Sequence, residues 1–171
     1  TPFNVGVIIN EGVGLSFAAP LPVVELYQTN STDFATADTT GFSKIYNDEV
    51  SWSAGAFNLI ADASNQLDFG WGDYDPGSND VLGTRVFAIK LRNGEYKKLE
   101  IQSLIDDGVY TFRFANLDGS NEVTATIDKA NYQGKSFAYY SIQNEMELDH
   151  EPSDWDMVFT RYITPLNDGS G

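Results

Sequence analysis

Cysteine is absent from the chain, and histidine occurs once, at His150. Without a thiol there can be no disulfide, no zinc–thiolate or iron–sulfur centre and no cysteine nucleophile. A single histidine excludes multi-histidine metal centres and leaves a Ser-His-Asp triad only one base. The sequence also lacks a Gly-x-Ser-x-Gly elbow and a phosphate-binding Gly-x-x-x-x-Gly-Lys loop. A serine hydrolase and a P-loop nucleotide-binding protein are therefore unsupported.

Basic residues are scarce: 10 Lys and Arg stand against 25 Asp and Glu, which gives a net charge of -15. Nucleic acid and anionic membranes would be repelled by such a chain, so neither is expected as a partner. No apolar run reaches the roughly 18 residues of a membrane helix. The 171 residues are 42% hydrophobic and 13% aromatic, which is typical of a folded protein. We expect a single domain over residues 1–171.

Alternating apolar residues in the middle of the chain predict antiparallel strands. Residues 85–91 alternate and lead to Asn93-Gly94, a dipeptide that favours a type I′ hairpin turn before a return strand at residues 96–101. Further alternation at residues 110–115 and 123–127, separated by the turn residues 118–121, adds two more strands. The sequence thus predicts an all-β fold built on an antiparallel meander, sandwich-like with few short helices.

Shorter signals surround this meander. They predict strands at residues 5–9, 57–60, 67–71, 137–142 and 155–163, short helices near 33–38 and 128–131, and long polar connections at 28–40 and 72–83.

One acidic loop has the oxygen ligands that calcium prefers. Asp73, Asp75 and Asp80 lie in a segment that also contains Ser78 and Asn79. The segment does not follow the EF-hand pattern, and its residues are equally those that tight turns require. Calcium binding here is a hypothesis, with a surface turn as the alternative.

Aromatic residues are the candidates for a ligand-binding face: Trp71, Tyr74, Tyr139 and Tyr140. Together with Trp71 and Tyr74, five carboxylates could line a sugar-binding face: Asp68, Asp73, Asp75, Glu147 and Asp149. With 25 acidic residues, almost any pair could also be nominated as the acid and nucleophile of a glycosidase. A glycosidase needs two carboxyl groups about 5 to 9.5 Å apart, which the sequence alone cannot supply. The alternative is that Trp71 packs in the core and that the acidic side chains are solvated.

Several blocks, taken in order, resemble the HmuY-like proteins of Bacteroidetes, especially their flavobacterial members. The blocks are residues 70–74 (GWGDY), 96–99 (YKKL), 115–123 (ANLDGSNEV), 138–142 (AYYSI) and 154–162 (DWDMVFTRY). The resemblance implies a mostly β fold on a protein that is secreted or held at the outer-membrane surface. It also implies that the chain is a fragment or processed form, without some N-terminal and C-terminal strands of the family.

The best-known members of this family bind haem between paired His or paired Met ligands. Paired His ligation is excluded because His150 stands alone. His150 with Met146 or Met157, or the two methionines together, are the remaining combinations, and none matches a ligand position of the family. Met157 lies at an apolar strand position, where core packing is its ordinary role.

The sequence therefore predicts an extracellular, non-catalytic HmuY-like surface or ligand-binding module without a cofactor other than calcium. Its partner would be a small molecule, a glycan or a surface protein. An acidic carbohydrate-binding or carbohydrate-cleaving protein is one alternative. The other is a structural subunit that assembles through its strand edges.

Overall fold

The computed structural model describes residues 24–38, 40–46, 55–106 and 108–151, and these residues form an all-β fold. The predicted fold class is confirmed. The strands are β1 (Glu25–Gln28), β2 (Ser43–Ile45), β3 (Gly72–Asp75), β4 (Asp80–Gly83), β5 (Phe87–Lys90), β6 (Tyr96–Ile105), β7 (Val109–Asn116), β8 (Val123–Asp128), β9 (Tyr139–Ser141) and β10 (Met146–Leu148). The described residues also form two short 3₁₀ helices, η1 (Ala56–Asn58) and η2 (Lys129–Tyr132). No helix within the described ranges is long and apolar enough to cross a membrane.

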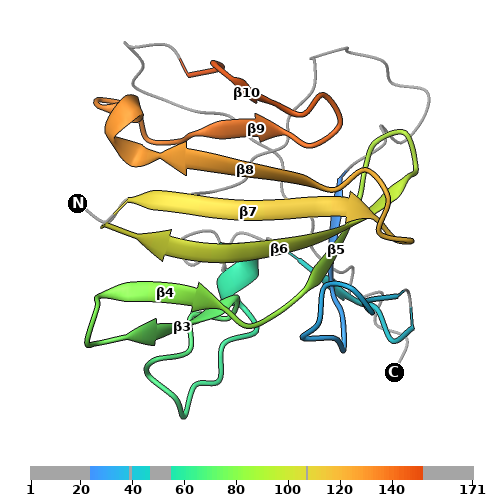
Figure 1. The fold of residues 1–171 in the computed structure, drawn as a ribbon, viewed down its shortest axis with the longest axis horizontal. Coiled ribbons are helices and arrows are strands. Elements are labelled where there is room, and N and C mark those ends of the chain that lie inside the picture. The colour runs from blue at the N-terminus through green and yellow to red at the C-terminus, as the bar shows by residue number, and fades with distance from the viewer. Residues whose placement is uncertain (1–23, 39, 47–54, 107, 152–171) are drawn as a thin grey trace, which may run out of the picture.

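Strand β6 is the centre of an eight-stranded antiparallel sheet. Along one edge it pairs with β7, which pairs with β8, and along the other it pairs first with β5 and then with β4. β1 and β2 continue the sheet beyond β5, and β3 continues it beyond β4. Figure 1 shows β6, β7 and β8 stacked through the middle of the molecule, with the separate β9–β10 hairpin beyond β8. The predicted meander is confirmed as β5 to β8.

The long strand β6 keeps its apolar residues on one face by means of a bulge. Leu99 and Ile101 face the core, and Leu104, three residues further on, is also packed against it. The pairing with β7 shifts between Ile101 and Ser103, which leaves Gln102 as an extra residue. One inserted residue reverses the alternation, so Leu104 returns to the core face.

The turn between β5 and β6 differs from the predicted type I′ turn. The Gly94 amide donates to the Leu91 carbonyl, the Leu91 amide donates to the Glu95 carbonyl, and Gly94 has a φ of 89°. Asn93 is not in the left-handed region that type I′ requires. The loop is therefore a three-residue hairpin loop in which Gly94 has the left-handed conformation. The Asn93-Gly94 dipeptide is compatible with this loop as well as with a type I′ turn.

Four further local predictions are corrected. Residues 57–60 lie at and after the 3₁₀ helix η1, and residues 67–71 form turns with a single bridge from Asp68 to Asp73. Residues 33–38 contain turns and no helix. The supposed connection at 72–83 is the β3–β4 hairpin. The predicted strands at 5–9 and 155–163 lie outside the described residues.

The sheet has one core face and one partly covered outer face. Phe87, Leu99 and Phe114 lie opposite one another on β5, β6 and β7, and they are at most 2% exposed. A smaller buried cluster forms on the other face where residues 31–38 cover it: Phe34, Ala37, Val86 and Ala115. The remainder of this outer face positions the candidate site.

Candidate functional site

The four aromatic residues chosen from the sequence do not form one surface. Trp71 is 5% exposed and packs against Tyr110, and Tyr140 is 8% exposed and meets the rings of Phe112 and Phe114 edge-on. Both are core residues, as the alternative interpretation of Trp71 held.

Tyr74 and Tyr139 are half-buried at separate places. The Tyr74 hydroxyl donates to Asn79 Oδ1 at 2.7 Å, within the β3–β4 hairpin. The Tyr139 ring lies 5.8 Å from that of His150, centroid to centroid. No described ring contact joins two of the four predicted residues.

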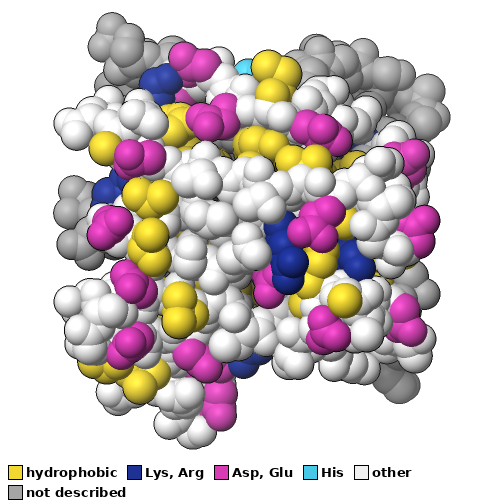
Figure 2. Space-filling model, viewed as in Figure 1, with side chains coloured by type: hydrophobic (Ala, Val, Ile, Leu, Met, Phe, Trp, Pro, Cys, Tyr) yellow, Lys and Arg dark blue, Asp and Glu magenta, His cyan; other side chains and the backbone are white. Residues whose placement is uncertain are grey.

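The acidic loop uses its oxygens in a turn. Asp75, the last residue of β3, lies opposite Asp80, the first residue of β4, and Asp75 Oδ1 accepts a 2.8 Å hydrogen bond from the Gly77 amide. Asp73, two residues before Asp75, is exposed on β3. Within the part of the chain that is described, no group of three or more His, Asp or Glu residues could hold a metal ion. Figure 2 shows acidic side chains spread over the whole visible face rather than gathered in one place. Calcium binding stays a prediction.

The haem combinations gain no support from the described residues. Met146 is 53% exposed on β10, and His150 is exposed beyond the same strand. Met157 lies outside the described residues.

Four of the five carboxylates considered for a sugar-binding face accept hydrogen bonds within the protein: Asp68, Asp75, Glu147 and Asp149. Both oxygens of Asp68 accept from the Arg85 guanidinium at 2.7 Å, and this pairing lowers the pKa of Asp68 well below its usual range. Glu147 accepts from the Tyr132 hydroxyl, and Asp149 accepts from the Lys135 ammonium. Asp73 and Asp75 lie on the β3–β4 hairpin described above.

A different aromatic group lies on the outer face of the sheet. The rings of Tyr27, Phe42 and Tyr96 have centroids 5.7 to 6.2 Å apart, and each residue is half-buried. We call these three residues the aromatic patch. They come from β1, from the residue before β2 and from the start of β6. None belongs to the main apolar core or packs against it among the described residues.

Charged side chains form the rim of the aromatic patch. Glu25 accepts from the Tyr27 hydroxyl and from Lys44 Nζ, the latter at 2.9 Å, and Lys90 Nζ lies 3.8 Å from its second oxygen. The Tyr27 hydroxyl and the lysines lower the pKa of Glu25. Burial and the hydrogen bonds to Glu25 and Tyr96 raise the pKa of Tyr27. The carboxylate is therefore ionised and Tyr27 protonated at neutral pH.

Strand register explains why these side chains meet. Glu25 lies opposite Lys90, which lies opposite Tyr96, so the three form a row across β1, β5 and β6. Tyr27 lies opposite Ala88, which is fully buried. Directly opposed residues share a face, and the small side chain at Ala88 leaves room for the rings beside it.

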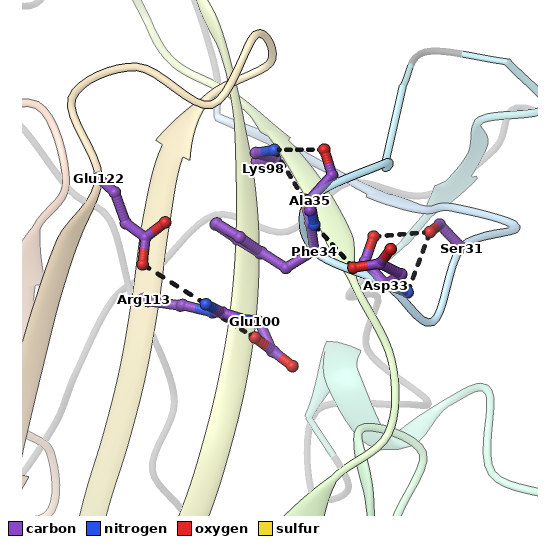
Figure 3. Close-up of polar contacts among 8 residues, drawn as sticks. All are labelled: Ser31, Asp33, Phe34, Ala35, Lys98, Glu100, Arg113 and Glu122. Atoms are coloured by element: carbon purple, nitrogen blue, oxygen red, sulfur yellow. Dashed lines mark hydrogen bonds and ion pairs between the residues drawn. The ribbon is translucent and has the colours of Figure 1, made fainter.

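The neighbouring part of the outer face is sealed by the 31–38 segment. Figure 3 shows the Phe34 ring between the ends of Lys98 and Arg113. Lys98 Nζ lies 4.7 Å from the ring centroid and donates to the Phe34 carbonyl at 2.6 Å, while the Arg113 guanidinium lies 4.2 Å from the same ring. Arg113 is also paired with Glu100 at 2.5 Å. Among the described residues, the 31–38 segment buries Phe34, whereas the three rings of the aromatic patch stay half-buried.

Sequence reasoning missed the aromatic patch because β1 was not predicted. The signal for β1 is the alternation of Glu25 and Tyr27 with Leu26, and this pattern is too short to predict a strand. Phe42 reaches the patch from outside any strand. Comparisons of the chain with family models, curated proteins and solved structures find no match. The site must therefore be interpreted from its own chemistry.

Proposed function

We propose that this chain is a non-catalytic, extracellular binding module and that its ligand is a carbohydrate stacked on the aromatic patch. The observation that carries the proposal is the convergence of three half-buried rings with charged groups at their rim. Aromatic faces suit the apolar face of a sugar ring, and carboxylate and ammonium groups can bind its hydroxyls. The extracellular location and HmuY-like class rest on the family resemblance alone.

The electrostatics of the described carboxylates support a non-catalytic role. The carboxyl groups whose pKa departs from its usual value, Glu25, Asp62, Asp68 and Asp118, all shift downward. A glycosidase general acid needs the opposite shift, because it must hold a proton near neutral pH. The downward shifts favour fixed ion pairs and turn hydrogen bonds over proton transfer.

Isothermal titration calorimetry with cellohexaose and hexagalacturonate tests the proposal. We expect at least one of these hexasaccharides to bind, and Phe42→Ala to weaken that binding at least tenfold. Phe69→Ala is the matched control, since Phe69 is also outside the strands, is 40% exposed, and lies beside β3 at the other end of the sheet. Equal loss in both variants, or no binding of either sugar to the wild type, would overturn the proposal.

A second candidate function is self-assembly through the outer edge of β8. No described residue pairs with that edge, although the β9–β10 hairpin lies beyond it, and the first five residues of β8, Val123 to Ile127, carry no charge. Uncharged edge strands are ready to pair with another chain. Sedimentation velocity at increasing concentration distinguishes the two: a monomer throughout contradicts assembly.

A further inference from the structure

The rim of the aromatic patch has a local excess of positive charge, although the chain as a whole is acidic. Two lysines, Lys44 and Lys90, share the single carboxylate of Glu25 at 2.9 and 3.8 Å. This local group has a charge of +1, from two ammonium groups and one carboxylate, in a chain whose net charge is -15. A net positive rim beside aromatic rings favours a ligand that has both a flat apolar face and a negative group, and at short range it opposes the repulsion that the net charge of -15 exerts on any anion.

The two lysines are accessible enough to bind such a group. Their side chains are 26% and 36% exposed, whereas the Glu25 side chain is 18% exposed. Lys90 Nζ also lies 5.9 Å from the centroid of the Tyr96 ring. A sugar stacked on that ring would therefore present a substituent close to Lys90. Glu25 pairs with both ammonium groups and so positions them at the rim.

From this charge arrangement we propose that the ligand of the aromatic patch is an anionic oligosaccharide, one whose pyranose rings carry carboxylates. The inference rests on the proposed carbohydrate-binding function and specifies its ligand class. The rings bind the apolar sugar face, Lys90 and Lys44 bind the carboxylate, and Glu25 orients the two ammonium groups. A neutral oligosaccharide would make the ring contacts and leave the positive rim uncompensated.

The test compares hexagalacturonate with its fully methyl-esterified form, which has the same sugar rings without the charges. We expect the wild-type chain to bind the anionic form at least fivefold more tightly at 50 mM NaCl, and this preference to shrink at 500 mM NaCl, where exposed charges are screened. Lys90→Gln should weaken binding of the anionic form about threefold, the magnitude of an exposed ion pair, and leave the ester unaffected. Lys97→Gln is the control, because Lys97 follows Tyr96 in β6 and its side chain therefore lies on the face of the sheet opposite to the aromatic patch.

The outcomes separate this inference from the proposed function. Equal affinity for the two forms, still lost in Phe42→Ala, overturns the anionic ligand and retains carbohydrate binding. Unchanged affinity in Lys90→Gln together with a salt-independent preference also overturns the anionic ligand. Absence of binding for both forms and for cellohexaose overturns the two proposals together.

Discussion

Replacing Lys98 by methionine should loosen the 31–38 segment, which covers part of the outer face. Lys98 is 1% exposed, so its four-carbon chain is buried and its ammonium reaches the backbone of the 31–38 segment. Methionine fills nearly the same volume without the charge. The substitution therefore removes the polar contacts of Lys98 and keeps most of its packing.

The expected loss follows from the contacts. The 2.6 Å hydrogen bond from Lys98 Nζ to the Phe34 carbonyl is charge-assisted and worth about 1.5–3 kcal/mol. The 3.4 Å approach to the Ala35 carbonyl adds little, and the cation–π contact with the Phe34 ring adds about 0.5–2 kcal/mol. Relief from burying an ammonium group offsets part of this sum. We expect a net loss of about 2 kcal/mol in the free energy of unfolding.

Urea unfolding followed by far-ultraviolet circular dichroism measures this loss, with Lys97→Met as the matched control. Lys97 is half-buried and hydrogen-bonded to Asn116, so its replacement should cost well under 1 kcal/mol. Hydrogen exchange should show faster amide exchange at residues 31–38 in Lys98→Met only. If the two variants unfold at the same urea concentration, Lys98 does not anchor this segment.

Three further substitutions test other parts of the structure by urea unfolding. Asp68→Asn should lower the free energy of unfolding by about 2–3 kcal/mol at pH 7, because it breaks the ion pair with Arg85, which keeps some solvent contact. Since the pKa of Asp68 is lowered in the folded state, this difference in stability between wild type and variant should be present above pH 4 and shrink as the pH falls below it. A difference that stays constant from pH 7 to pH 3 would contradict the pairing. Gly83→Ala should cost about 3 kcal/mol, because a Cβ there would lie 2.0 Å from a backbone oxygen of β6, and a wild-type midpoint would refute this close approach. Burial and the hydrogen bond to Glu147 raise the pKa of Tyr132 to about 12 in the folded protein. The wild type should therefore lose stability relative to Tyr132→Phe as the pH rises from 10 to 12. Parallel pH profiles of the two proteins would show that this hydrogen bond is absent.

The meander was predictable because its signals are local. The strands β5 to β8 alternate over several residues, and each connection contains Gly with Asn or Asp. The β3–β4 hairpin was misjudged although its turn residues were recognised, because its four-residue strands are too short to show alternation. The bulge at Gln102 hid the second half of β6 by reversing the pattern.

Lys98 illustrates what local patterns cannot show. It alternates with Leu99 as a solvent-facing residue should, in the same way as Lys90 and Glu100. The segment that buries it lies more than 60 residues earlier in the chain, and no periodicity in β6 encodes that contact. The same limit applies to the aromatic patch, whose rings come from three separate segments.

Phe34 and the aromatic patch lie on the same outer face but differ in burial, and this difference supports the proposed binding role of the patch. Phe34, where the face is covered, is 3% exposed and its flanking cations are neutralised by internal partners or bound to backbone oxygens. The patch rings stay half-buried, contact one another, and are not part of the main core among the described residues. Because stabilisation grows with the apolar area removed from water, each half-buried ring of the patch contributes less than a ring buried as Phe34 is. Rings held in fixed positions at the surface instead retain apolar area that a ligand can still bury.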